Sequence, residues 1–513
     1  MSKSVSYEIE ECKCLLCIFP ESLFKYILMI QNSCNTAGLN PYVPSANDPW
    51  DEVKIKHFYR RVGIDPSPQQ ITEALQQNPQ EWIDTIINLA EKEPPAPAPV
   101  WGFWPKKNFD NSDEINYYLA RRELSQTICK RLEAKGLRER MAMFWKNHFV
   151  TQWFTYQSSA YSYQYYSVLE KNAMGDFREM TSEIGLTAPM LIYLNGNQNK
   201  KGRPNENYAR ELYELFTLGE NNGYTQRDIE ETAKALTGYT KKVSNGGPII
   251  FEDRRFDTSD KTIFGQTGNW GYDDVIRIVF ETHPDRIANF IAKKIYHFFV
   301  SPVDPDPGLI TELGKSFKDA NFQITPMLRL LLKSEHFFDT STIGVVVKSP
   351  LDLLVGMLSS TGMKARENYN IYLKFHFWLS AMGQELFNPP DVAGWQRDRS
   401  WITTSSIVNR WKLTGAIVDQ FWRHDREQFR TFALAVAGDS KDPKQVTRAI
   451  MDHLLAQKLP NASEYDAATD IFKGDVPENY FEDGIWSLYF QNATEQVRDL
   501  LKHITRIPEF QLK

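Results

Sequence analysis

The chain has 513 residues, of which 42% are hydrophobic, 13% aromatic and 24% charged, a composition that can bury a large core and argues against disorder. Its formal net charge is −6, which argues against a general nucleic-acid surface, because phosphate binding needs a clustered excess of cations. No apolar run reaches the roughly 18 residues that a membrane-spanning helix needs, so no transmembrane segment is predicted.

The N-terminus does not have the pattern of a signal peptide. Glu8, Glu10 and Glu11 oppose a positive n-region, so a cytoplasmic location is the default expectation. Cysteines at positions 12, 14 and 17 could bind a metal, but the chain supplies no second pair of ligands near them. We therefore favour an accessory extension over residues 1–45 and predict no metal site.

Residues 46–513 are predicted to form one large, mainly α domain. The first convincing helical pattern is Asp51–Val62, and a longer one extends from residue 114 to residue 150. Between residues 245 and 270 the pattern changes to short extended pieces separated by glycines, which predicts a small β-hairpin element.

A histidine stands on an apolar helix face in the segment from Leu137 to residue 150. Met141, Phe144 and His148 share that face, so His148 is predicted to be buried. A buried histidine is more often a satisfied core residue than a ligand. The neighbouring Asn147 and the approach of a carboxylate would instead favour acid–base or binding chemistry.

The densest set of polar side chains at helical spacing lies between residues 205 and 240. Asn207, Arg210, Glu211 and Glu214 fall on one stripe of a predicted helix that ends at Gly219. Glu211 lies at the edge of the apolar face and needs a polar partner once it is buried. The stripe is either a solvated ion-pair network or a catalytic or binding surface.

We expect His148 to pair with Glu211, because each would be a polar group facing the interior. A second polar segment, residues 388–405, combines two prolines with Asp391, Trp395 and several hydroxyl groups. Such a loop either lines a pocket or serves as a structural plug. The candidate catalytic residues are therefore His148, Glu211 and Glu214, and the candidate binding residues are Asn147, Asn207, Arg210, Asp391 and Trp395.

The sequence lacks the phosphate-binding, dinucleotide-binding, hydrolase and zinc-protease motifs that would identify a reaction. No cofactor can be assigned. With its segments in order, however, the chain resembles the bacterial family called "domain of unknown function 1800". The matching pieces are residues 57–61 with Pro66, 144–149, Asn207 with 209–212 and 215–219, Asp257 with 261–262 and Gly265, 348–350, and Pro389-Pro390 with Gly394-Trp395.

The resemblance implies a largely helical protein of a family whose members are often exported and whose genes commonly neighbour a family similar to sulfatases and alkaline phosphatases. A sulfatase-like protein is thus an expected partner by analogy. Where the family usually has His-Asp, this chain has Phe256-Asp257, so any family site that uses that histidine is altered here.

Two functions follow as hypotheses. The first is an accessory or interaction protein that acts with a sulfatase-like partner. The second is a hydrolase or transferase that uses His148 with Glu211. A cavity shared by His148, Glu211 and Trp395 would favour the enzyme.

Overall fold

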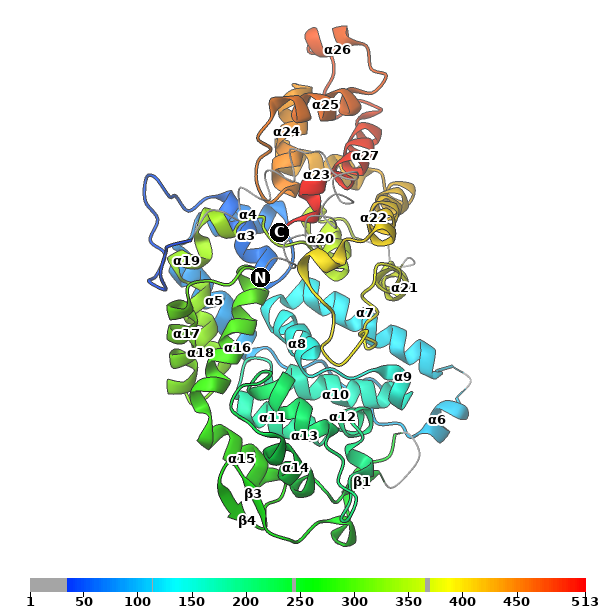
Figure 1. The fold of residues 1–513 in the computed structure, drawn as a ribbon. Coiled ribbons are helices and arrows are strands. Elements are labelled where there is room, and N and C mark those ends of the chain that lie inside the picture. Colours follow the sequence, from blue (N-terminus) through cyan, green and yellow to red (C-terminus); the bar gives the residue numbers. More distant parts are fainter. Residues whose placement is uncertain (1–34, 113, 242–245, 365–369) are drawn as a thin grey trace, which may run out of the picture.

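The computed structural model describes residues 35–112, 114–241, 246–364 and 370–513. Over these residues the protein is mainly α, as predicted, with helices labelled α3 to α27 and two small antiparallel sheets. The helices are stacked along one long direction, with the strands at one end and α24 to α26 at the other (Figure 1).

The first half of the chain is almost entirely helical. Its α-helices are α3 (Glu52–Val62), α4 (Pro68–Leu75), α5 (Pro79–Lys92), α6 (Lys106–Asp110), α7 (Tyr117–Lys135), α8 (Leu137–His148), α9 (Trp153–Tyr156), α10 (Ser159–Asn172), α11 (Phe177–Gly185), α12 (Ala188–Tyr193), α13 (Asn207–Glu211) and α14 (Gln226–Ala235). A π-helical turn, η2 (Leu212–Thr217), continues α13 directly.

The second half is also helical. Its α-helices are α15 (Tyr272–Thr282), α16 (Pro284–Phe299), α17 (Pro307–Asp319), α18 (Ile324–Leu332), α19 (Glu335–Phe338), α20 (Pro350–Thr361), α21 (Tyr372–Ala381), α22 (Thr404–His424), α23 (Glu427–Ala437), α24 (Pro443–Leu454), α25 (Ala462–Lys473), α26 (Glu478–Glu482) and α27 (Ala493–Ile504). Short 3-10 turns are η1 (Gly196–Gln198), η3 (Asp253–Arg255), η4 (Thr340–Thr342), η5 (Asp398–Trp401) and η6 (Pro508–Gln511). None of the helices in the described ranges is long and apolar enough to cross a membrane.

The β element predicted near residues 245–270 is confirmed, and it consists of two separate ribbons. Strand β1 (Tyr239–Lys241) pairs antiparallel with β2 (Ile249–Phe251), with Thr240 opposite Ile250. Strand β3 (Lys261–Ile263) pairs with β4 (Gln266–Gly268), with Thr262 opposite Thr267. The first ribbon begins before residue 245, because its strand β1 starts at Tyr239. Residues 242–245 lie outside the described part of the chain.

Local sequence signals account for many helix boundaries. Asp51 caps α3 by accepting a hydrogen bond from the backbone N–H of Lys54, and Thr225 forms the predicted capping box with Asp228 at the start of α14. The helical pattern from residue 114 to residue 150 is divided at Gly136, whose positive φ of 56° separates α7 from α8.

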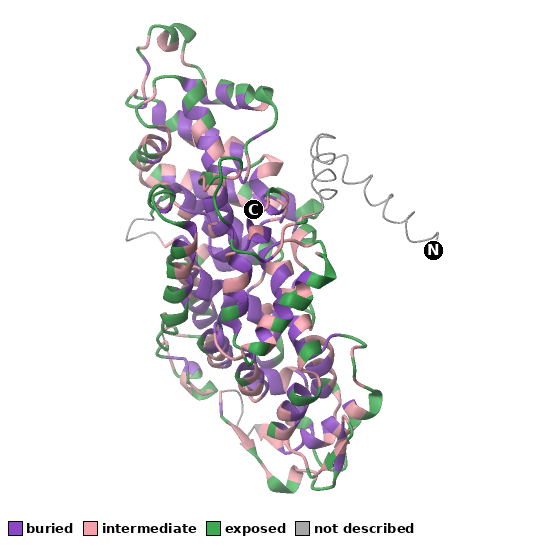
Figure 2. Ribbon diagram, turned by 90° about the vertical axis from the view of Figure 1, so that its left-hand side faces the viewer, coloured by how far each residue is buried: buried purple, intermediate pink, exposed green. Residues whose placement is uncertain are grey.

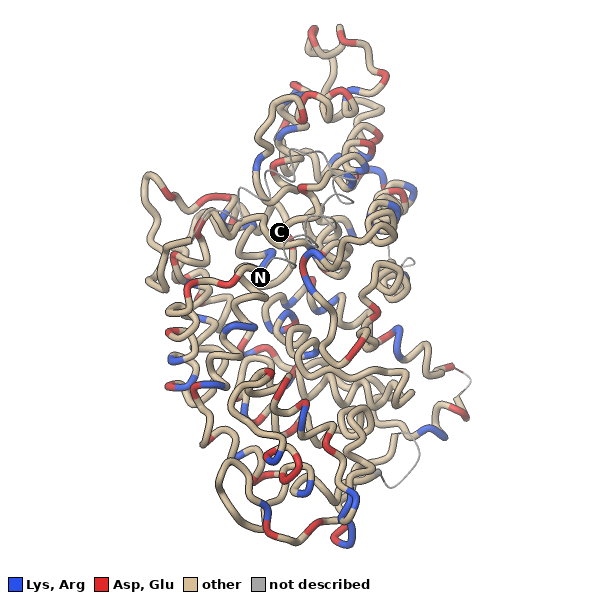
Figure 3. Tube along the Cα trace, viewed as in Figure 1, with Lys and Arg blue, Asp and Glu red and all other residues tan. Residues whose placement is uncertain are grey.

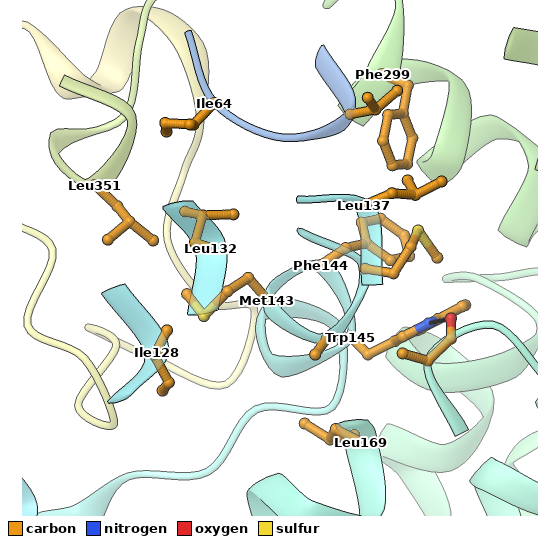
Figure 4. Close-up of a cluster of buried hydrophobic side chains, with 14 of the residues drawn as sticks. Ile64, Ile128, Leu132, Leu137, Met143, Phe144, Trp145, Leu169, Phe299 and Leu351 are labelled. Carbon is orange, nitrogen blue, oxygen red and sulfur yellow. Dashed lines mark hydrogen bonds between the residues drawn. The ribbon is translucent and has the colours of Figure 1, made fainter. Parts of the chain in front are cut away.

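Helix α8 is the centre of the core. Met141, Ala142 and Trp145 are fully buried, and the indole N–H of Trp145 donates to the carbonyl of Ala173 over 3.0 Å. Apolar side chains from several neighbouring segments surround this helix (Figure 4), and buried residues run through the middle of the molecule along its length (Figure 2). Side chains of α8 therefore face either the core or an internal cavity.

The described part of the expected extension, residues 35–45, packs onto the helical body. Leu39 and Tyr42 are buried, and the backbone N–H of Tyr42 donates to the carbonyl of Lys333 over 2.8 Å. The cysteines at positions 12, 14 and 17, considered as metal ligands in the sequence, lie outside the described residues.

Candidate functional site

A cavity of about 420 Å³ lies beside α8, between α16, the start of α20 and the loop of residues 388–401. Among the predicted site residues, Asn147, His148 and Trp395 line it. Six charged side chains line it too: Arg140, Lys294, Asp352, Arg397, Asp398 and Lys513. Cations thus outnumber carboxylates on the cavity wall.

His148 is buried, as predicted, with 4% of its surface exposed. Its Nε2 lies 3.0 Å from the carbonyl oxygen of Phe216, and its Nδ1 lies 3.1 Å from Nζ of Lys294. Because a carbonyl can only accept, Nε2 carries the proton and donates it to Phe216, while Nδ1 accepts from Lys294. Burial, followed by the charge of Lys294, holds the pKa of His148 well below its usual value, so the ring is neutral.

Lys294 and His148 donate hydrogen bonds to backbone carbonyls at the end of a helix. The carbonyls of Leu215 and Phe216 belong to the last turn of the segment formed by α13 and η2, where backbone acceptors have no partner within the helix. Lys294 donates to Leu215 over 3.0 Å, as His148 does to Phe216. These contacts fix both side chains at the cavity wall.

Two cations at the cavity have no acidic partner among the described residues: Lys294 and Arg397. Burial, and then the nearby charge of Arg397, lowers the pKa of Lys294 to about 7. Burial alone lowers the pKa of Arg397 to about 10, and the guanidinium lies over the ring of Phe298 at 5.5 Å. The charge of Arg397 therefore makes the charged state of Lys294 less favourable.

The remaining charges at the cavity balance one another. Asp352 forms ion pairs with Arg140 at 2.5 Å and with Lys513 at 2.7 Å. Asp398 accepts from the backbone N–H of Val347 over 2.9 Å. The uncompensated positive charge thus comes from Lys294 and Arg397.

Trp395 closes another part of the wall. The side-chain amide of Asn147 pairs with the backbone of Trp395, accepting from its N–H over 2.8 Å and donating to its carbonyl over 3.2 Å. The buried indole N–H of Trp395 has no hydrogen-bond partner within the described part of the chain. Trp395 thus lines the cavity while its indole donor is left unsatisfied.

The predicted polar stripe on α13 lies elsewhere. Arg210 forms ion pairs with Glu206 at 3.0 Å and Glu214 at 3.2 Å, and Asn207 is exposed. The stripe thus contains an ion-pair network in contact with solvent. Its residues do not line the cavity of His148.

The expected hydrogen bond between His148 and Glu211 is not formed. Both ring nitrogens of His148 have other partners, because the end of the α13–η2 segment faces His148 and its polar stripe does not. Glu211 is half-buried, and burial followed by the charge of Glu214 raises the pKa of its carboxyl group. The sequence expectation on this point is wrong.

Glu211 and Asp391 instead influence a common neighbour, Tyr193. Burial, followed by the charges of Asp391 and Glu211, raises the pKa of Tyr193 to about 12. Asp391 itself is exposed and accepts from the backbone N–H of Ala393 over 2.8 Å. The predicted site residues thus divide into a group that lines the cavity and a group outside it, which consists of the polar stripe and Asp391.

Sequence reasoning missed Lys294 and Arg397. Lys294 stands beside the apolar face of α16, where its position gives no sign of function. Arg397 follows Trp395 by two residues in the loop that was identified as a possible pocket wall, so the sequence contained a local signal for it. No group of three or more metal-ligating side chains is found within the residues that the structure describes.

Comparisons with known proteins gave one match. A family model described as "Protein of unknown function (DUF1800)" matches residues 57–512, which confirms the resemblance drawn from the sequence motifs. Searches of curated proteins and of solved structures found no match.

Proposed function

The chain thus belongs to the DUF1800 family, and we propose that it is a binding protein that holds an anionic group, such as phosphate, sulfate or a carboxylate, in the cavity beside His148. This proposal uses the cavity group of residues and leaves the α13 stripe with a structural role.

The uncompensated pair of cations is the observation that carries the proposal. Lys294 and Arg397 face one cavity of about 420 Å³ and have no carboxylate partner among the described residues. An anion between them would offset the unfavourable effect of the Arg397 charge on protonated Lys294. Arginine also offers a planar set of donors suited to phosphate, sulfate or carboxylate oxygens.

An accessory role beside a sulfatase-like partner agrees with this chemistry. Enzymes of the sulfatase and alkaline phosphatase type act on esters of oxyanions, so an associated protein with an oxyanion cavity would bind the substrate or the product of such a partner. The support for this partner is the family resemblance alone, which is an analogy.

Binding can be measured by isothermal titration calorimetry with sulfate, inorganic phosphate and acetate, each added to protein in a buffer free of these ions. We expect saturable binding of at least one anion and a higher melting temperature in its presence, because a ligand that binds only the folded state stabilises it.

Two substitutions locate the site. Arg397→Gln is expected to weaken anion binding about tenfold or more, since a hydrogen-bonded charge pair is lost. Arg399→Gln, which changes an exposed arginine two residues away, is the matched control and should leave binding unchanged. Equal affinity in the wild type and the Arg397 variant would contradict the proposal.

The partner can be tested separately by co-purification with a candidate sulfatase-like protein. Recovery of a complex whose stability falls when the cavity anion is removed would support the accessory role. A failure to associate at micromolar concentrations of both proteins would contradict it.

A hydrolase or transferase is the second candidate, favoured by one observation. Lys294 and His148 are hydrogen-bonded at the cavity wall, and the pKa of Lys294 is lowered to about 7, close to the value that suits a general acid or base. In this version Lys294 replaces Glu211 as the partner of His148. Turnover of aryl phosphates or aryl sulfates that is abolished in Lys294→Met would support it, and the absence of turnover would contradict it.

A further inference from the structure

We infer that Lys294 captures an aldehyde or ketone that carries a phosphate or carboxylate group, forming an imine with its carbonyl carbon while Arg397 binds the anionic group. The inference rests on the proposed anion cavity and adds a reaction and a substrate class to it.

The hydrogen bonds of Lys294 match a neutral amine. A neutral amine has two N–H donors and one lone pair, and the structure supplies two acceptors to Nζ: Nδ1 of His148 at 3.1 Å and the carbonyl of Leu215 at 3.0 Å. Both N–H groups are then satisfied and the lone pair is left free. The ring of Phe290 also neighbours the amine, with its centroid 4.6 Å from Nζ.

The surroundings of Lys294 favour the same state. Burial and the neighbouring Arg397 guanidinium both lower the pKa, to about 7. About half of such an amine is neutral at pH 7, against fewer than about one in a thousand for an ordinary lysine of pKa near 10.4. Desolvation and an adjacent cation are the two means by which proteins activate lysine as a nucleophile.

The cavity can hold both ends of the molecule that we propose. Lys294 and Arg397 line the same space of about 420 Å³, so an anionic group at the guanidinium would place a nearby carbonyl at the amine. His148 acts here as a positioning residue, because its Nδ1 fixes the direction of one N–H bond.

The chemical step is balanced without a further reactant. The lone pair of Nζ forms a bond to the carbonyl carbon, and the π electrons of the C=O bond move to oxygen, which takes up a proton to give a carbinolamine. The oxygen then leaves as water with both hydrogens of the amine, and a C=N bond forms. Hydrolysis reverses the sequence and returns the free amine.

The test uses pyridoxal 5′-phosphate as an anionic aldehyde, pyridoxal as the same aldehyde without phosphate, and sodium borohydride to reduce any imine. Modified lysines are identified by mass spectrometry of peptides after brief exposure at pH 7. We expect Lys294 to be trapped at least about tenfold faster than Lys293, since its neutral fraction is far larger. Lys293 is the matched control because it is exposed and paired with Asp304 at 2.9 Å.

Three further comparisons define the site. Inorganic phosphate should protect Lys294 from pyridoxal 5′-phosphate, and Arg397→Gln should slow that reagent about tenfold while leaving pyridoxal less affected. Lys146 has a pKa that burial lowers to about 7, yet only 2% of its surface is exposed. It should remain unmodified, which would show that access to the cavity is required as well as a neutral amine.

The outcomes separate this inference from the proposed function. If calorimetry detects phosphate binding that depends on Arg397 but Lys294 is trapped no faster than Lys293, the imine is excluded and the binding function stands. If neither binding nor selective trapping is found, both fail. Selective trapping that is lost in Lys294→Met, in a variant with an unchanged circular dichroism spectrum, supports the inference.

Discussion

Asp352 is a buried carboxylate that serves as the counterion of two cations in the interior of the protein. It is 2% exposed, and besides its ion pairs with Arg140 and Lys513 it accepts from the backbone N–H of Ser349 over 3.0 Å. Asp352→Asn leaves two cations in the interior without a counterion, so we expect the free energy of unfolding to fall by about 3–5 kcal/mol. Urea denaturation measures this change.

Asp419→Asn is a suitable comparison for Asp352. Asp419 pairs with Lys502 at 3.0 Å, but 37% of its side chain is exposed. A surface pair of this kind contributes less than about 1 kcal/mol. A similar loss of stability in the two variants would show that burial of the Asp352 cluster does not matter.

His453 is expected to make the protein less stable in mild acid. It is 3% exposed, its Nε2–H donates to the carbonyl of Ser360 over 2.8 Å, and burial is the main cause that lowers its pKa to about 4. In the unfolded chain a histidine takes up its proton near pH 6.5, so the unfolded state binds more protons between pH 6.5 and pH 4.

The contribution of His453 to stability is complete above about pH 6.5 and is lost as the pH falls toward 4, by on the order of 3 kcal/mol in all. Urea denaturation at several pH values should show a shallower decrease over this range for His453→Gln. Identical pH profiles for the variant and the wild type would refute the expectation.

At the level of elements, the loop that carries Trp395 depends on Gly394. This glycine has a φ of 86°, and a Cβ at this position would lie 2.4 Å from Oδ1 of Asn147, the atom that accepts from Trp395. Gly394→Ala is therefore expected to displace the loop and to cost about 1–3 kcal/mol through the lost hydrogen bonds. Anion binding should weaken as well.

Gly383→Ala separates steric overlap from backbone strain. Gly383 has a φ of 91°, but a methyl group at this position would meet no heavy atom within 4 Å. Its substitution therefore carries only the strain of a left-handed conformation, about 1–2 kcal/mol. Melting temperatures of the two variants provide the comparison. A smaller loss for Gly394→Ala than for Gly383→Ala would contradict the role assigned to the Asn147 contact.

The helices and their caps could be predicted because they depend on residues close in sequence. Apolar periodicity placed His148 in the interior, and the capping residues marked the start of α14. The partners of His148 could not be predicted, since they are a backbone carbonyl in a π-helical turn and a lysine 146 residues away. Sequence reasoning considered only side chains as partners of His148 and therefore selected Glu211. In the structure one partner is a backbone carbonyl at the end of the α13–η2 segment.

For the whole molecule, positively and negatively charged residues are interspersed along the Cα trace (Figure 3). The composition therefore gives no indication of where unpaired charge gathers. The cavity obtains its charge from tertiary structure, which brings α16 and the loop after residue 388 to α8. Net charge and local sequence pattern could thus describe the distribution of charge on the surface, but they could not locate the cavity lined by Lys294 and Arg397.

The extent of cooperative unfolding tests whether residues 46–513 form one domain. The C-terminal helices are tied to the N-terminal ones by buried side chains: Lys56 donates to the carbonyl of Leu455 over 3.3 Å and Arg60 to that of Leu454 over 2.9 Å. The end of the chain also returns to the centre, where Leu512 pairs with Val347.

These contacts leave buried charged groups unpaired if α22 to α27 separate from the rest, which costs several kcal/mol. We therefore expect one transition in differential scanning calorimetry, with equal calorimetric and van't Hoff enthalpies. Two resolved transitions, or a stable proteolytic fragment that contains α23 to α27, would show instead that the C-terminal helices unfold independently. Because the cavity lies between elements from both halves of the chain, a single transition also predicts that an anion bound at Lys294 and Arg397 raises the melting temperature of the whole molecule.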